Sequence, residues 1–140
     1  MPRLSLTRRV TFAAAHRYRR PEWSEERNVE VFGKCSREAW HGHTYTCDVS
    51  VAGAVDPITG FVVDLVVLDD ILAREVTARF DHRNINTDVP EFAEGRLVPS
   101  CENLAAYIAA HVQAALEARA QVTRVWLSEG PTLWAEWTAD

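Results

Sequence analysis

The sequence predicts an α+β fold in which an antiparallel four-stranded sheet carries two helices on one face. Three observations predict it. Two early segments alternate apolar and polar residues with the two-residue period of a strand, two later segments repeat apolar residues at helical spacing, and two short strand-like segments close the chain. The expected order is strand, strand, helix, helix, strand, strand, which is typical of the α+β class.

The first two strands are predicted from their alternation. Apolar residues recur at even positions from Leu4 to Ala14, and a second alternating run extends from His43 to Val51. Residues 17–40 between them are polar, aromatic and irregular. Because this segment is too long for a tight hairpin, we expect a functional loop there. Turn-forming residues at 56–60 end the second strand.

The helices and the last strands follow from the second half of the chain. Asp64 is a suitable N-cap for a helix over 64–80, and Pro99-Ser100 opens a second helix. His111 lies on the apolar face of this second helix, so we interpret it as a packed core or interface histidine. Strands are expected at 122–128 and 132–138, with Trp134 and Trp137 on opposite faces of the last one. We expect another subunit to cover that strand.

The composition excludes several classes of protein. A chain of 140 residues fits one domain, 1–140, with an ordinary core. Its net charge of −5 argues against generic nucleic-acid binding, and its longest mostly apolar stretch, 104–116, is too short to cross a membrane. Residues 1–20 lack the apolar run of a secretory signal, and three cysteines make a poor disulfide framework. We therefore expect a cytoplasmic protein with reduced thiols.

Three histidines form a candidate metal site. His41-Gly42-His43 places two imidazoles on the same face of a strand, roughly 6.5 to 7 Å apart at Cα. If the first two strands pair antiparallel, His16 at the end of the first meets the start of the second. Three neutral nitrogens without a carboxylate favour Zn²⁺ and leave a fourth position for water or substrate. The alternative is that these are ordinary surface or core histidines, since an isolated His-x-His pair is weak evidence.

Cys35 is the candidate fourth ligand or base near this site. It lies six positions before His41 and next to Lys34, the only lysine in the chain. Its sulfur has two possible roles: a fourth ligand that closes a structural metal site, or a base beside an open one. Lys34 and a nearby divalent ion would both favour the thiolate.

These residues belong to a wider pattern that resembles the 6-pyruvoyl tetrahydropterin synthase family over about residues 6–137. The resemblance implies the tunnelling fold, in which the sheets of three subunits close a barrel and two trimers stack into a homohexamer. The matching segments are Arg9-Val10-Thr11-Phe12 through His16-Arg17, Val31-Phe32-Gly33-Lys34-Cys35, His41-Gly42-His43-Thr44-Tyr45, Val55 to Gly60, Asp81-His82-Arg83-Asn84, Asp88-Val89-Pro90, Glu102-Asn103 and Glu129.

The resemblance also implies catalytic roles. The three histidines would bind zinc, and Cys35 would be the general base. Asp81 and His82, an ordinary surface pair when taken alone, would activate Cys35 across a subunit boundary.

Further roles concern the substrate, 7,8-dihydroneopterin triphosphate. Glu129 would hold the guanidine-like edge of its pterin by paired hydrogen bonds. Ser100, Cys101 and Glu102 would line the pterin pocket, although Cys101 stands where the family usually has Thr or Ser. From charge alone, Lys34 and the arginines of residues 17–20 are candidates for the triphosphate.

The implied activity is that of a carbon-oxygen lyase. It would convert the substrate into 6-pyruvoyl tetrahydropterin by triphosphate elimination and an internal redox step. One alternative is 6-carboxy-tetrahydropterin synthase of the queuosine pathway, in which three residues usually intervene between the cysteine and the histidine pair, whereas five residues, 36–40, intervene here. The other is a non-catalytic pterin-binding ring protein. The joint presence of Cys35, Asp81, His82 and Glu129 argues against it, because a binder needs only Glu129 and the pocket.

Overall fold

The computed structural model describes residues 3–140, and its centre is a five-stranded sheet in the order β3-β1-β2-β4-β5. The predicted α+β class is confirmed, but the expected count of four strands was wrong. The fifth strand, β3, pairs parallel with β1 and is two residues long, too short for any periodicity to reveal it. The strands are β1 (Leu4–His16), β2 (His41–Gly53), β3 (Arg83–Asn84), β4 (Gln121–Ser128) and β5 (Trp134–Thr138).

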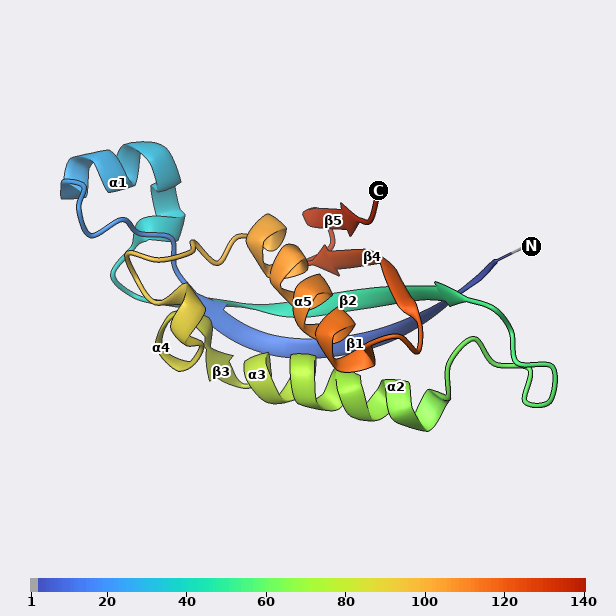
Figure 1. Ribbon diagram of the computed structural model, residues 1–140. Helices are drawn as coiled ribbons and strands as arrows, with labels where there is room; N and C mark the ends of the chain where they lie inside the picture. Colours follow the sequence, from blue (N-terminus) through green and yellow to red (C-terminus); the bar gives the residue numbers. More distant parts are fainter. Residues whose placement is uncertain (1–2) are drawn as a thin grey trace.

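Two helices, α2 (Leu65–Leu72) and α5 (Cys101–Leu116), pack on the sheet from one side (Figure 1). The predicted N-cap Asp64 and the predicted helix start at Pro99-Ser100 are confirmed, since the Asp64 and Ser100 side chains accept hydrogen bonds from backbone N–H groups of the first turn. The predicted helix over 64–80 continues from α2 through a π-helical segment, η2 (Ala73–Thr77), into α3 (Ala78–Phe80). The short α4 (Ile85–Asp88) and η3 (Pro90–Phe92) precede α5.

Residues 17–40 contain more regular structure than expected. Helix α1 (Glu25–Phe32) begins at Ser24, whose side chain accepts a hydrogen bond from the Arg27 N–H, and the 3-10 turn η1 (Gly33–Ser36) follows it. The expectation of an irregular loop was wrong, because α1 buries only Asn28 and has no repeating set of buried apolar residues that would mark it. In Figure 1, α1 projects beyond the end of the sheet.

The long ladder between β1 and β2 sets the geometry of the site. Leu4 lies opposite Gly53 at one end, and His16 lies opposite His41 at the other. The predicted meeting of the end of β1 with the start of β2 is therefore confirmed. Gly42 allows this close approach, because a Cβ at that position would lie 3.3 Å from the Ala14 carbonyl oxygen.

The core lies between the sheet and the two helices, and the site continues it. Phe12 stacks on Tyr45 with ring centroids 4.8 Å apart and on Phe80 at 5.4 Å. Steps of two residues along β1 and β2 lead from this buried pair to His16 and His43 on the same face. Each large apolar side chain buried here contributes roughly 1.5 to 3 kcal/mol, so the triad is attached to the most stable part of the molecule.

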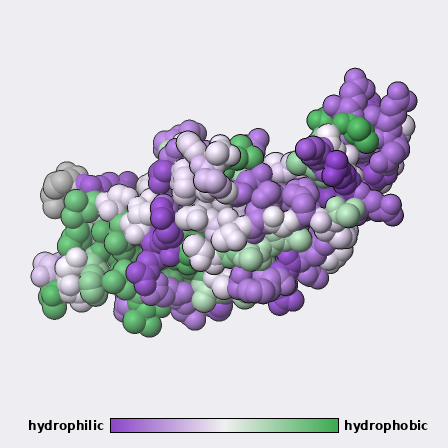
Figure 2. Space-filling model, turned by 180° about the vertical axis from the view of Figure 1, so that it is seen from behind, coloured by the Kyte–Doolittle hydropathy of each residue, from purple (hydrophilic) through white to green (hydrophobic). Residues whose placement is uncertain are grey.

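The surface seen from behind carries both hydrophilic and hydrophobic side chains. Figure 2 shows hydrophobic side chains gathered at the end where β1 starts, where Leu4 and Ile58 are exposed. On β5, Trp134 is 55% exposed, so within one chain the expected cover of that strand is not formed. Its coverage by another subunit stays a prediction. Within residues 3–140, no helix is long and apolar enough to cross a membrane.

Candidate functional site

His16, His41 and His43 converge at the end of the sheet as predicted. Their potential ligand nitrogens all lie within 4.8 Å of one another. The ring centroids of His16 and His41 are 4.7 Å apart, and each is 5.1 Å from that of His43. One ion placed between the rings can therefore contact all three residues.

Hydrogen bonding fixes which nitrogen of His16 faces the cluster. Its Nδ1 lies 2.9 Å from the Pro99 carbonyl oxygen, which can only accept, so this nitrogen carries the proton. The Tyr45 hydroxyl lies 3.2 Å from the same atom. Among residues 3–140, the buried Nε2 atoms of His16 and His43 have no hydrogen-bond partner. A buried unpaired polar atom costs about 1 to 3 kcal/mol, and a bound metal ion would remove that cost.

The protonation states also suit a metal centre. Burial, followed by the proximity of His41 and His43, lowers the pKa of His16 to about 3. Burial and His43 also lower the pKa of His41. Neutral imidazole is the form that binds metal, so these residues are prepared as ligands near pH 7.

Cys35 is linked to the triad through Tyr18, whose ring contacts His16. Its carbonyl oxygen accepts a hydrogen bond of 2.8 Å from the Tyr18 N–H, and its side chain is half-buried. The ligand cluster in the described part of the chain contains the three histidines and not this sulfur. Burial and the negative charge of Glu129 raise the pKa of Cys35, opposite to the lowering that Lys34 and a metal ion are expected to produce.

Glu129 and the start of α5 reach the same end of the sheet. Ser128 pairs with Thr46 on β2, so Glu129 follows next to the strand that carries the triad. The Cys101 thiol lies 3.6 Å from the Leu127 carbonyl oxygen and 3.8 Å from Glu129 Oε2. Burial, then Glu129 and Glu102, raise the pKa of this thiol to about 12.

The other two predicted pocket residues flank Cys101. Ser100 is half-buried and caps α5 through its Oγ, which accepts from the Asn103 N–H, whereas Glu102 is exposed. The structure therefore brings Cys101 close to Glu129, and the role of these residues in a pterin pocket stays a prediction.

Asp81 and His82 come directly before β3, the strand at one edge of the sheet. Asp81 Oδ1 accepts from the Ala13 N–H at 3.0 Å, and Oδ2 lies 3.0 Å from His82 Nδ1. These hydrogen bonds lower the pKa of Asp81 and keep it charged. The His82 side chain is 84% exposed, and its φ of 58° is unusual for a residue other than glycine. The expected contact with Cys35 across a subunit boundary stays a prediction.

The basic residues considered for triphosphate binding differ in whether a carboxylate already occupies them. Arg17, Arg19 and Arg20 each form an ion pair with a nearby carboxylate, which reduces their capacity to bind a triphosphate. Lys34 is exposed and has no ion pair within residues 3–140. It remains the better candidate for a phosphate contact.

The sequence did not identify three residues that shape the site: Tyr45, Pro99 and Tyr18. Tyr45 could have been found, because it follows His43 at the two-residue period on the same strand face. The Pro99 contact comes from a backbone carbonyl, and no side-chain pattern reveals such a contact.

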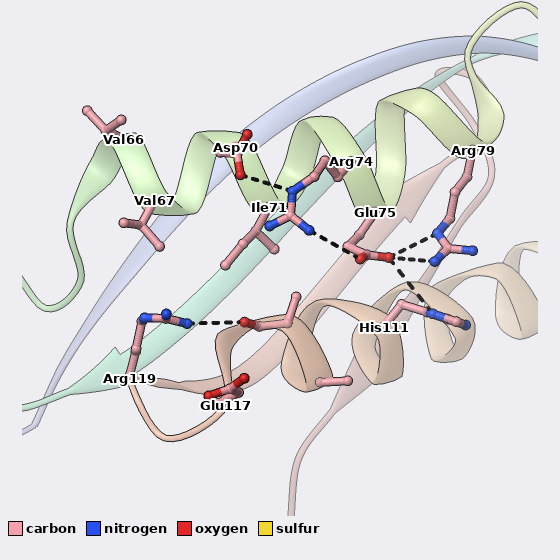
Figure 3. A pocket seen from close by; sticks show the side chains of 12 residues that line it. Val66, Val67, Asp70, Ile71, Arg74, Glu75, Arg79, His111, Glu117 and Arg119 are labelled. Atoms are coloured by element: carbon pink, nitrogen blue, oxygen red, sulfur yellow. Dashed lines mark hydrogen bonds and ion pairs between the residues drawn. The ribbon is translucent and has the colours of Figure 1, made fainter.

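A surface cavity of about 760 Å³ lies elsewhere, between α2 and α5. Figure 3 shows Glu75 paired there with Arg74 and Arg79, with His111 Nδ1 4.0 Å away. His111 stacks on Tyr107 at 4.1 Å and is not part of the triad. Because Glu75 in the wall of this cavity is already paired with two arginines, we interpret the cavity as the surroundings of a surface ion-pair network and not as the functional site.

Comparisons with known proteins agree with this geometry. Residues 5–140 match the family described as 6-pyruvoyl tetrahydropterin synthase. The 6-pyruvoyl tetrahydrobiopterin synthase of Drosophila melanogaster is 39% identical over 127 residues, covering 90% of this chain and 74% of the relative. That of Poecilia reticulata is 41% identical over 113 residues, covering 81% and 76%. The solved structure of Caenorhabditis elegans 6-pyruvoyl tetrahydropterin synthase has a TM-score of 0.91 at 31% identity and covers 100% of this chain and 98% of that one. This chain belongs to the 6-pyruvoyl tetrahydropterin synthase family.

Proposed function

We propose that this chain is a zinc-dependent 6-pyruvoyl tetrahydropterin synthase, a carbon-oxygen lyase that acts on 7,8-dihydroneopterin triphosphate. The observation that carries the proposal is the set of three converging imidazoles, two of which have an unpaired buried nitrogen, with the Cys35 thiol outside the ligand cluster, in a chain of this family. We further propose that residues 1–140 form a single domain and that the enzyme acts in the cytoplasm.

The metal would be held by the three imidazoles. Three nitrogen ligands without a carboxylate suit Zn²⁺ and leave a position for the substrate. When bound, the ion would act as a Lewis acid toward oxygens of the substrate side chain, making the neighbouring C–H more acidic. His16 would keep a fixed orientation throughout, because Pro99 holds its Nδ1 proton.

Cys35 would take the proton from the substrate side chain. A base works best when its pKa lies near the working pH. The surroundings of Cys35 raise its pKa in the chain alone, so a metal ion, Lys34 or a neighbouring subunit would have to compensate.

The substrate would lie with its pterin ring at Glu129. A carboxylate there can accept two parallel hydrogen bonds from the guanidine-like edge of the ring. Ser100, Cys101 and Glu102 would form the wall beside it, and Lys34 would contact the triphosphate. Departure of triphosphate together with proton transfers between the side chain and the ring needs no external reductant.

Assembly would complete this site. We propose the tunnelling fold with a homohexamer built from two trimers, in which β5 meets the sheet of a neighbouring subunit. The exposed Trp134 on β5 and the exposed His82 beyond β1 support this, since both lie toward edges of the sheet. Asp81 and His82 would then face Cys35 of an adjacent copy.

Product analysis tests the proposal directly. The zinc-loaded protein is incubated with 7,8-dihydroneopterin triphosphate, and triphosphate and pterin products are identified by mass spectrometry. We expect triphosphate and 6-pyruvoyl tetrahydropterin from the wild type and from Cys47→Ala, whose thiol lies in the core, but not from Cys35→Ala. A 6-carboxy product with acetaldehyde would assign the chain to the sister activity. Substrate binding without triphosphate release would favour the pterin-binding ring protein.

A further inference from the structure

Tyr45 lies next to the histidine triad and has no role in the proposed reaction so far. It is fully buried and follows His43 by two residues on β2, so both side chains point to the same face of the sheet. Its ring centroid is 6.1 Å from that of His16 and 5.8 Å from that of His43. The Tyr45 ring therefore borders two of the three candidate metal ligands.

The core holds the Tyr45 ring in one orientation. Phe12 lies opposite Tyr45 in the β1–β2 ladder, and the two rings stack with centroids 4.8 Å apart. Phe80 of α3 stacks in turn on Phe12 at 5.4 Å. Side chains in such close-packed surroundings keep a preferred rotamer. The position of the Tyr45 hydroxyl is therefore set before any metal ion binds.

The Tyr45 hydroxyl contacts the nitrogen of His16 that faces away from the cluster. Its oxygen lies 3.2 Å from His16 Nδ1, and the Pro99 carbonyl oxygen lies 2.9 Å from the same atom. One N–H group can be shared between two acceptors. The Nδ1–H group of His16 is therefore surrounded by two oxygens, one from the backbone before α5 and one from a side chain of the core.

The reverse arrangement, in which the Tyr45 hydroxyl donates to Nδ1, is disfavoured. Nδ1 would then carry no proton and would face the Pro99 carbonyl oxygen at 2.9 Å, so that two lone pairs would oppose each other. The proton of the neutral ring would lie on Nε2, and a protonated nitrogen cannot bind a metal ion. With the proton on Nδ1, the lone pair of Nε2 is free, and this buried atom has no hydrogen-bond partner within residues 3–140.

We propose that Tyr45 is a positioning residue for the metal ion. Its hydroxyl oxygen accepts a hydrogen bond from His16 Nδ1–H and, together with Pro99, keeps the lone pair of Nε2 directed at the other two imidazoles. Groups bound to the second nitrogen of a metal-binding histidine fix its tautomer and orientation and increase its basicity. This inference rests on the proposed function, which requires the metal, and deepens it by adding a residue outside the ligand set.

The zinc affinity of Tyr45→Phe tests the contact, because this variant keeps the stacked ring and removes only the hydroxyl. Loss of a contact of this kind lowers metal affinity by about 10- to 100-fold. Since the Pro99 carbonyl still accepts from the imidazole, we expect the Kd for zinc to rise by roughly 10-fold, measured by competition with a chromophoric chelator. Tyr107→Phe is the matched control, because its hydroxyl contacts Arg79 and Glu91, and its Kd should equal that of the wild type.

Nitrogen NMR of the metal-free wild type tests the same arrangement without any substitution. Selective ¹⁵N labelling of the histidine rings shows which nitrogen of each neutral imidazole carries the proton. We expect the proton of His16 on Nδ1 in the wild type, and a mixture that includes the Nε2–H form in Tyr45→Phe. Circular dichroism of the metal-free variant should match that of the wild type, because the ring that packs in the core is retained.

Two results would overturn the inference. One is equal zinc affinity of Tyr45→Phe and the wild type. The other is a metal-free wild type in which His16 carries its proton on Nε2. Failure of the wild type to bind zinc would instead refute the proposed zinc dependence. The NMR measurement would still decide whether Tyr45 and Pro99 set the tautomer of His16, because it needs no metal.

Discussion

The histidine triad and the Asp81–His82 pair, two parts of the proposed active site, differ in how completely a single chain forms them. The triad is attached to the core through β1 and β2, and its buried member, His16, is oriented by Pro99, whereas His41 and His43 are partly buried. The Asp81–His82 pair is held by the backbone of Ala13, but its imidazole points into solvent. One chain therefore brings together three histidines that could bind a metal ion, whereas the Asp81–His82 pair lies at an edge of the sheet. Binding should depend on the single chain, and catalysis on the assembly.

Metal removal should give the largest change in activity and a small change in fold. Chelation is expected to abolish triphosphate release, because no side chain can replace the ion's effect on the substrate oxygens. The β1–β2 ladder and the apolar core do not involve the ion. Circular dichroism before and after chelation should therefore be nearly unchanged. Unfolding upon chelation would instead indicate a closed structural site.

Cys35→Ala should lower kcat by about 10²- to 10⁴-fold, the usual contribution of a positioned acid or base. Substrate affinity should change little, because the thiol is not among the groups proposed to hold the pterin. Stopped-flow triphosphate release and a binding titration measure the two quantities. A variant that retains full triphosphate release would remove Cys35 from its proposed role.

Mixing two inactive variants tests whether assembly joins the two regions. Cys35→Ala and Asp81→Asn should each be nearly inactive as separate oligomers. If each site takes Cys35 from one subunit and Asp81 from its neighbour, random reassembly restores about a quarter of the sites. Activity is measured after the mixed subunits are dissociated and reassembled. No recovery, with mixed oligomers confirmed by native mass spectrometry, would place both residues in the same subunit's site.

The smallest expected effect concerns the thiol chemistry of the metal-free protein. Since the pKa of Cys35 is raised, less thiolate is present at pH 7 than in a free cysteine, and iodoacetamide should react slowly. The rate should increase with pH, and Glu129→Gln should accelerate it by removing a nearby negative charge. Buried Cys47 is the internal control and should not react. Mass spectrometry of the labelled peptides gives both rates, and an unchanged rate in Glu129→Gln would contradict the proximity of the two groups.

Sequence patterns predicted the parts of the fold that depend on periodicity. Alternation located β1 and β2, and the antiparallel pairing then brought His16 to His41. Helix α1 and strand β3 were missed for the same physical reason, because neither buries a repeating set of apolar residues that would mark it.

The sequence predicted the site residues that lie on the paired strands β1 and β2. It predicted fewer of the contacts that come from other parts of the chain. The triad follows from strand geometry, but the orientation of His16 depends on a carbonyl at residue 99, far along the chain. Likewise, Arg17 looked free in the sequence and is paired with Glu94 in the structure. Such contacts are set by tertiary packing, which no local pattern encodes.

X-ray absorption spectroscopy of the zinc-loaded protein tests the central claim most directly, namely that three imidazoles bind the ion while the Cys35 sulfur stays unbound. We predict a first shell of nitrogen and oxygen atoms only, at about 2.0 to 2.1 Å. A sulfur atom in that shell at about 2.3 Å would contradict the account, because a sulfur bound to the metal cannot serve as the base.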